Sequence, residues 1–167
     1  MSEKDLRNLI EYASNFAEGA MRLHGNVAPI WHMITSSGQE IVELTPQTEN
    51  KDYAMAMIRA LMEIEHVVRY VYFAEAWMLD FKNSDGRPSQ EELDRIMEEG
   101  ASQHPDRIEC VVFQAEDNEW GMLSGHRKII RNGEHRPRLG PLEFMPRHTE
   151  STGRMVGLLP KPEGRLQ

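Results

Sequence analysis

The sequence predicts an α+β fold: an antiparallel sheet of about five to six strands with two to three helices packed mainly on one face. Two observations lead to this prediction. Helix-like and strand-like segments do not alternate strictly along the chain, which disfavours a parallel sheet built from βαβ units. The strand-like segments are also joined by short turns, as in hairpins and meanders. We expect one domain over residues 1–145 and an irregular C-terminal extension over residues 146–167.

Residues 3–24 are expected to form the first helix, because apolar side chains recur along one stripe at helical spacing. A Gly-Asn pair follows, and both residue types tolerate the left-handed backbone that ends a helix. The segment from Pro29 to Pro46 predicts a β-hairpin with arms at residues 30–34 and 40–44. This hairpin supplies the N-terminal part of the sheet.

Residues 51–66 predict a second helix, which is apolar most of the way round and contains three methionines. Such a helix is expected to be buried on more than one side. Methionine is an adaptable core filler, and a methionine-rich helix also suits a surface that binds a partner. We expect a core role, with the partner-binding face as the alternative.

The run Arg69–Leu79 is rich in aromatic and β-branched residues and predicts the central strand. Glu75 lies within this run among aromatic neighbours. A carboxylate in such surroundings needs a partner, because burying an unpaired charge is costly. Glu75 is therefore the residue of this strand that requires an explanation.

A third helix is expected to follow the central strand. Ser89 and Glu92 form a capping-box pattern at its start. Gly100 is expected to close it. The residues expected to face inward are Leu93, Ile96 and Met97.

Residues 107–115 and 119–131 predict the next two strands, since both are rich in apolar residues and end at turn-forming segments. Gly121 and Gly125 lie within the second of them. Glycine inside a strand indicates a bulge or a close approach of another backbone. We expect one of these features here.

Asn132-Gly133 predicts a two-residue hairpin turn. The returning arm is expected to start near Glu134 and to reach residues 142–144 as an edge strand, because two prolines interrupt it. In the extension that follows, residues 155–159 are apolar enough to dock on the domain.

Side-chain alternation along the strands predicts a polar cluster on one face of the sheet. Glu75 would then meet residues of the next two strands beside Trp77, with Arg107 as its expected partner. The predicted binding residues are Glu75, Trp77, Arg107, Glu109, Arg127, Arg131 and His104.

Three interpretations of this cluster stay open. The first is a cross-strand salt-bridge ladder with a structural role. The second is a ligand pocket in which arginine anchors an anion and Trp77 forms an apolar wall. The third is a small hydrolase or isomerase in which Glu75 or Glu109 acts as general base with help from His104.

Sequence motifs for common chemistries are missing. There is no GxSxG, no phosphate loop, no GxGxxG and no metal-ligand spacing. Cys110 is the only cysteine, so neither an internal disulfide nor a cysteine-based zinc site can form. We therefore expect no cofactor and no metal.

The chain also lacks signals for a membrane or for export. No run of about 18 apolar residues is present. The N-terminus, Met-Ser-Glu-Lys-Asp, has neither the basic start nor the apolar centre of a signal peptide. We expect a cytoplasmic protein that does not contact a membrane.

Charge is distributed unevenly along the chain. Residues 1–125 carry 10 Lys/Arg against 23 Asp/Glu, whereas residues 126–167 carry 9 against 4. We expect the basic end to pair with the acidic body. We do not expect nucleic acid as a partner, because the acidic body opposes binding to a polyanion. The alternative is nucleic-acid contact through Arg127, Lys128, Arg131, Arg136 and Arg138.

Three segments carry a resemblance to known proteins: residues 74–78 (AEAWM), 104–109 (HPDRIE) and 129–131 (IIR). They resemble small uncharacterised proteins of bacteria and their phages, over roughly residues 15–135. The resemblance implies a shared α+β domain and a link to phages or mobile elements. It implies no catalytic residues.

We therefore expect a non-enzymatic binding domain. Its partner would be another protein or a second copy of the chain, reached through an exposed sheet edge or the methionine-rich helix. The alternatives are the small hydrolase or isomerase acting on an anionic small molecule, and the nucleic-acid contact named above.

Overall fold

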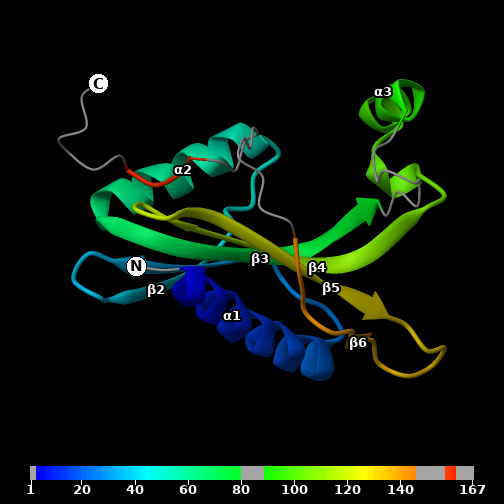
Figure 1. The fold of residues 1–167 in the computed structure, drawn as a ribbon, viewed down its shortest axis with the longest axis horizontal. Coiled ribbons are helices and arrows are strands. Elements are labelled where there is room, and N and C mark those ends of the chain that lie inside the picture. The colour runs from blue at the N-terminus through cyan, green and yellow to red at the C-terminus, as the bar shows by residue number, and fades with distance from the viewer. Residues whose placement is uncertain (1–2, 80–88, 146–156, 161–167) are drawn as a thin grey trace.

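The computed structural model describes residues 3–79, 89–145 and 157–160 (Figure 1). Its helices are α1 (Glu3–His24), α2 (Lys51–Ile64), α3 (Gln90–Glu99) and the short 3-10 helix η1 (Ala101–Gln103). Its strands are β1 (Ile30–Thr35), β2 (Glu40–Leu44), β3 (Val67–Leu79), β4 (Arg107–Asp117), β5 (Gly121–Ile130), β6 (Arg138–Leu139) and β7 (Glu143–Phe144). The predicted α+β class is confirmed.

The strands form one antiparallel sheet in the order β2-β1-β3-β4-β5-β6. The short strand β7 also pairs with β5, next to β6. The predicted N-terminal hairpin is β1–β2, the central strand is β3, and the meander runs through β4 and β5. Because β3 and β4 pair along 11 residue positions, they form the long spine of the sheet.

One long helix covers each face of the sheet, α1 below and α2 above in Figure 1. This differs from the expectation that the helices pack mainly on one face. The reason lies in β3, where neighbouring residues point to opposite faces of the sheet. Hydrophobic side chains occupy both of these faces. Tyr70 packs in the α2 cluster, whereas Val71 and Phe73 pack in the α1 cluster, and all three are at most 2% exposed. Both faces therefore need a cover.

Helix α3 lies apart from both cores, at the outer end of the long β3–β4 pair (Figure 1). Its capping box forms as predicted, with Ser89 and Glu92 bonded to each other's backbone. The prediction that its apolar residues face inward was wrong, because no residue of α3 is buried. Met97 is 87% exposed. Amphipathic spacing predicts the helix but does not say whether anything covers its apolar side.

The connection after β5 is longer than predicted. Ile130 pairs with Arg138, so residues 131–137 form the loop and the two-residue turn was wrong. Pro137 has no amide to continue a ladder. Arg136 instead donates to the last carbonyl oxygens of α1, those of Arg22 (3.0 Å) and Leu23. The loop is thereby held on the end of α1.

Two smaller predictions are confirmed. A Cβ at Gly125 would lie 3.1 Å from the carbonyl oxygen of Glu143, which is the close backbone approach that glycine allows. Leu158 and Leu159 are buried in the α2 cluster, as expected for an apolar segment that docks. Residues 146–156 and 161–167 of the expected C-terminal extension lie outside the described residues.

Candidate functional site

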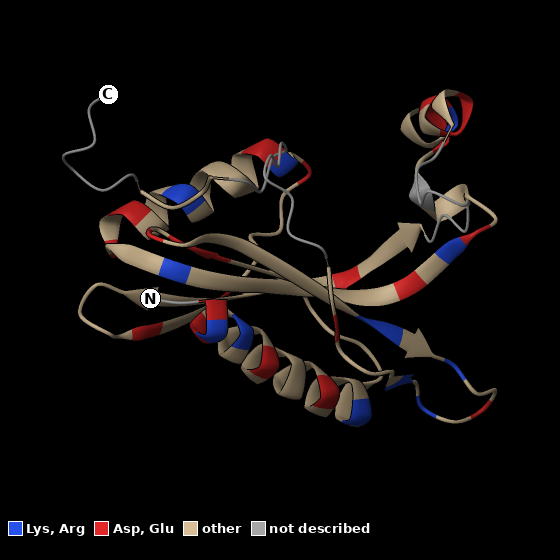
Figure 2. Ribbon diagram, viewed as in Figure 1, with Lys and Arg blue, Asp and Glu red and all other residues tan. Residues whose placement is uncertain are grey.

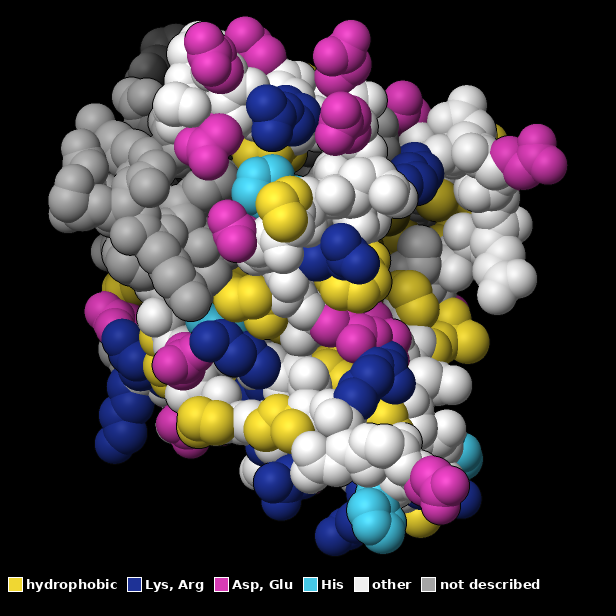
Figure 3. Space-filling view, turned by 90° about the vertical axis from the view of Figure 1, so that its right-hand side faces the viewer, with side chains coloured by type: hydrophobic (Ala, Val, Ile, Leu, Met, Phe, Trp, Pro, Cys, Tyr) yellow, Lys and Arg dark blue, Asp and Glu magenta, His cyan; other side chains and the backbone are white. Residues whose placement is uncertain are grey.

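The strand register brings the predicted polar cluster to the face of the sheet that α1 covers. Glu75 on β3 pairs with Val111 on β4, which in turn pairs with Arg127 on β5. The next pair on this face is Trp77 with Glu109. Figure 3 looks at this end of the molecule, where acidic and basic side chains lie side by side with hydrophobic side chains between them.

Glu75 is held by a backbone amide. Its Oε1 accepts a hydrogen bond of 2.7 Å from the nitrogen of Val27, in the segment that links α1 to β1. Val27 itself is 4% exposed. The carboxylate thus satisfies a buried donor, which would otherwise cost free energy. This is a different partner from Arg107, which the sequence had suggested.

Arg107 stacks on Trp77 instead. The guanidinium carbon lies 5.4 Å from the centre of the Trp77 ring, a cation–π distance. Arg107 also donates from Nη1 to the carbonyl oxygen of His104, at 3.2 Å. Trp77 is 45% exposed, so this pair lies at the surface.

His104 lies in the turn that leads into β4. It is 7% exposed, and its Nδ1 accepts a hydrogen bond of 3.1 Å from the amide of Asp106. Its carbonyl oxygen accepts from the amide of Arg107. These bonds shape the turn, which is the structural role expected of a buried histidine with local partners.

Glu109 and Arg131 form a two-pronged ion pair across the sheet. Nε of Arg131 donates to Oε2 of Glu109 at 2.7 Å, and Nη2 contacts Oε1. The hydrogen bonds from Arg131 lower the pKa of the Glu109 carboxyl, and the same bonds raise the pKa of Arg131. The Arg131 side chain is 51% exposed, so solvent screens the pair.

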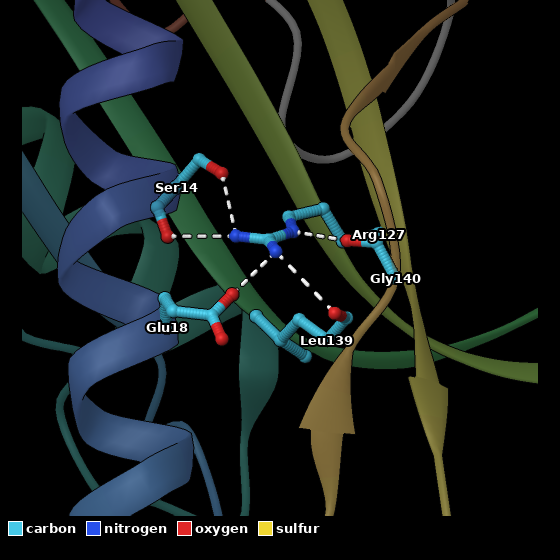
Figure 4. A network of polar contacts seen from close by, with 5 residues as sticks. All are labelled: Ser14, Glu18, Arg127, Leu139 and Gly140. Carbon is cyan, nitrogen blue, oxygen red and sulfur yellow. Dashed lines mark hydrogen bonds and ion pairs between the residues drawn. The ribbon is translucent and has the colours of Figure 1, made fainter.

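Arg127 ties three parts of the fold together (Figure 4). Its Nε donates to the carbonyl oxygen of Gly140 at 2.6 Å. Its Nη1 donates to the Ser14 hydroxyl at 3.2 Å, and its Nη2 forms an ion pair with Glu18 and a long bond to the Leu139 carbonyl. The side chain is 14% exposed. Arg127 therefore fastens α1 to β5 and to the segment after β6.

The predicted cluster is thus a row of paired groups. Each carboxylate, Glu75 or Glu109, already accepts from a donor of the fold, and Arg107 lies on an aromatic ring. No group of three or more His, Cys, Asp or Glu side chains in the described part of the chain is placed to hold a metal ion. The arrangement favours a structural role, but it is not the expected cross-strand salt-bridge ladder, because only Glu109 and Arg131 form a salt bridge with each other.

Three arginines in the described part of the basic segment contact the rest of the fold. Figure 2 shows Lys and Arg gathered at the end of β5 and in the loop that follows. Arg127, Arg131 and Arg136 there contact Glu18, Glu109 and the end of α1 respectively. Arg127 and Arg131 thus pair with carboxylates, as the charge distribution led us to expect for the basic end, whereas Arg136 contacts backbone carbonyl oxygens.

A hollow in the described part of the chain lies at the C-terminal end of α2. Its volume is about 940 Å³, within the range of ligand sites. Its polar lining comes from Ser36, Arg59, Glu63, His66 and Asn118, and its apolar lining from Val67, Val68, Leu158, Leu159 and Pro160. His66 has a φ of 52°, the left-handed backbone with which a helix often ends.

Glu116 lies near two residues that line this hollow, Leu158 and Arg59, and is bonded to Tyr70. The Tyr70 hydroxyl donates to Oε2 of Glu116 at 2.8 Å. Burial raises the pKa of the Glu116 carboxyl, and the hydrogen bonds from Tyr70 and Leu158 and the charge of Arg59 oppose that rise. Burial and the nearby carboxylate raise the pKa of Tyr70 well above its usual value.

A smaller hollow, of about 240 Å³, lies between α1 and the β1–β2 hairpin. His32 in its lining is 5% exposed and packs on the Tyr12 ring with centroids 5.2 Å apart. Nε2 of His32 lies 3.3 Å from Oε2 of Glu40, without the alignment of a hydrogen bond. Both ring nitrogens are closed off from solvent. A ligand in this hollow would not reach them.

None of the seven predicted residues lines either hollow. The sequence analysis did not predict Arg59, Glu63, His66 or Glu116 as site residues. A usable signal for Arg59 and Glu63 was their spacing of four residues, which places both on one side of α2. Glu116 could not be found in this way, because its link to Tyr70 depends on strand order.

Comparisons with known proteins do not place the chain: no family model, no curated protein and no solved structure matches it. Among the described helices, none has the length and apolar character needed to cross a bilayer.

Proposed function

We propose that the chain is a cytoplasmic, non-enzymatic interaction domain that binds a partner protein on the outer face of α2. One observation carries this proposal. Tyr53, Met57 and Ile64 are 59%, 45% and 70% exposed on a helix whose opposite side is buried in the core. Large apolar side chains grouped on an exposed helix face mark interaction surfaces in soluble proteins.

Helical spacing places these three residues together. Met57 follows Tyr53 by four residues and Ile64 follows Met57 by seven, so they lie along one side of α2. Ala60, which is also exposed, completes the stripe between Met57 and Ile64. The inner side is made by Ala54, Met55, Ile58 and Met62. Helix α2 thus has apolar residues on two sides, one packed in the core and the other exposed to solvent.

The hollow at the end of α2 extends this surface. Arg59 and Glu63 line it and belong to the same helix as the stripe. An apolar centre with charged groups at its margin is the usual anatomy of a protein interface. The partner that fits is an amphipathic helix with a narrow apolar stripe and polar flanks, bound along α2.

The test is capture of a partner by the tagged chain from a lysate of its host, followed by binding measurements with the purified partner. We expect Met57→Glu to weaken binding at least about tenfold, or ~1.4 kcal/mol, because it puts a charge into an apolar contact. Met57→Leu keeps the apolar surface and is expected to bind like the wild type.

Met97→Glu on α3 is the matched control, since Met97 is 87% exposed on a separate surface. It is expected to leave capture of the partner unchanged. A partner that binds the wild type and Met57→Glu equally would refute α2 as its docking surface. A chain that captures nothing with Met57 intact would refute the proposal itself.

The paired state of Glu75, Glu109 and Arg107 supports a binding role over the hydrolase or isomerase alternative. A general base needs a free carboxylate within reach of a substrate. The engagement of Arg127 and Arg131 likewise weighs against the nucleic-acid alternative. The interaction domain is therefore the function that we propose.

A further inference from the structure

The strand β2 is an edge of the sheet, and its outward backbone groups can be assigned. The amide of Thr35 donates to the carbonyl of Gln39, and the amide of Thr45 donates to the carbonyl of Pro29. Bonded positions alternate along an antiparallel pair. Ile41 and Glu43 therefore bond to β1. The N–H and C=O groups of the other three residues, Glu40, Val42 and Leu44, point away from the sheet.

These outward groups suit pairing with an identical strand. If a second β2 strand pairs with Val42 opposite Val42, Glu40 of each copy lies opposite Leu44 of the other. Glu40, Val42 and Leu44 then all occupy positions that form hydrogen bonds between the two strands. Each N–H and C=O that points outward then finds a partner. A two-fold axis produces this arrangement, since antiparallel pairing of identical strands is self-complementary.

Charge selects this register over its neighbour. In the chosen register, Glu43 lies opposite Ile41 of the second copy. In the neighbouring register, with Val42 opposite Leu44 of the second copy, Glu43 would lie opposite Glu43. Like charges directly opposite each other are destabilising. In the register on the other side, with Val42 opposite Glu40 of the second copy, Leu44 would lie beyond the end of the second β2 strand.

The side chains of the edge add apolar surface. Val42 and Leu44 are each 60% exposed and lie on the α1 side of the sheet, next to His32 and Ile30. In the paired arrangement, Val42 meets its own counterpart across the axis and Leu44 covers the stem of Glu40. Exposed apolar residues on an unpaired edge are a liability that most proteins avoid.

We propose that two copies of the chain associate through β2, in antiparallel pairing with Val42 opposite Val42, into a dimer with one continuous sheet. The partner is a second copy and the surface is the β2 edge, so the inference is independent of the partner-binding face on α2.

Sedimentation of the full chain over a broad concentration range tests the association. We expect the mass to rise from 19.3 kDa towards twice that value. Val42→Glu places like charges opposite each other and is expected to weaken the dimer at least about tenfold. Val42→Thr keeps a β-branched side chain and is expected to preserve it. Met57→Glu is expected to leave the dimer intact, which separates this surface from α2.

Cysteine cross-linking tests the register. Two Cα atoms in a hydrogen-bonded antiparallel pair lie about 5.5 Å apart, a distance that a disulfide spans. Val42→Cys is therefore expected to give a covalent dimer on oxidation. Leu44→Cys is the matched control, because its two copies would lie about 14 Å apart at ~3.4 Å per residue.

The native Cys110 does not interfere with this test. It is fully buried, and burial raises the pKa of its thiol to about 11. A chain that stays monomeric at every concentration would overturn the proposal, and its edge glutamates would then serve to block pairing. Equal cross-linking of Val42→Cys and Leu44→Cys, or a dimer that Val42→Glu does not weaken, would overturn it as well.

Discussion

The amide of Val27 donates a hydrogen bond of 2.7 Å to the carboxylate of Glu75, across 48 positions of sequence. This bond joins the segment after α1 to the central strand of the sheet. It explains why a carboxylate occurs in an aromatic strand: the buried amide of Val27 has no strand partner there and needs an acceptor. Glu75 thus has a structural role.

Removing this acceptor should destabilise the domain. Glu75→Ala leaves the Val27 amide unsatisfied, and a hydrogen bond to a charged group contributes about 1.5–3 kcal/mol. We expect a loss of that size in the free energy of unfolding, measured from urea transitions. Glu75→Gln retains an oxygen acceptor and should lose less. Glu11→Ala, an exposed change on α1, should stay within about 0.5 kcal/mol of the wild type.

Arg127 should matter more than Glu75. Arg127→Met keeps the length of the side chain but leaves the Gly140 carbonyl and the Glu18 carboxylate without their partner. Breaking a buried ion pair costs about 3–5 kcal/mol. Because the Glu18 side chain is 39% exposed, we expect a loss of about 2–3 kcal/mol in the free energy of unfolding.

A double-mutant cycle checks the origin of that loss. Glu18→Gln in the Arg127→Met background removes the stranded charge and should recover part of the stability. Additive losses from the two substitutions would contradict a direct coupling between Arg127 and Glu18.

The Glu109–Arg131 pair predicts a small effect that depends on pH. The pair is partly exposed, so Glu109→Gln should cost ~1 kcal/mol or less at neutral pH. The folded-state pKa of the Glu109 carboxyl is lowered, so the stabilisation from the pair is fully present above the unfolded-state pKa of about 4.3. It should disappear as the pH falls through the lower folded-state pKa.

Urea transitions of the wild type and Glu109→Gln, compared from neutral to acidic pH, measure this contribution. The difference between the two proteins should shrink as the solution becomes acidic, and added salt should reduce it at neutral pH. A difference that grows on acidification would show that the pair does not stabilise the folded state.

Side-chain alternation was enough to place Glu75 and Trp77 on one face of their strand, because the period of a strand fixes its faces. That Glu109 of the next strand shares this face was a hypothesis, which the strand register bears out. Alternation could not name the partner of Glu75, since Val27 offers a backbone amide that carries no sequence signature. The sequence therefore predicted a cluster of side chains, but the role of Glu75 within it follows only from its bond to Val27.

The helices show the same limit. The pattern of residues 51–66 predicts a helix that is apolar nearly all round, but the free side of α2 follows from what the sheet leaves uncovered. Leu93 and Met97 repeat at helical spacing and yet remain exposed on α3. Periodicity determines which residues share a face, and only tertiary packing determines whether that face is buried.

Glu116 should respond to pH in the direction opposite to Glu109. Burial raises its folded-state pKa, so the folded state holds its proton at a higher pH than the unfolded state does. The wild type should therefore lose stability as the pH rises from about 4.3, the unfolded-state value, through the folded-state pKa. Glu116→Gln cannot ionise and keeps an acceptor for the Tyr70 hydroxyl.

The measurement is the free energy of unfolding of the wild type relative to Glu116→Gln as a function of pH. The relative stability of the wild type should be greatest in acid and should fall across that interval. If the stability of the wild type relative to Glu116→Gln instead rises with pH, the prediction is wrong. The lowering of the Glu116 pKa by Tyr70, Leu158 and Arg59 would then exceed the raising by burial.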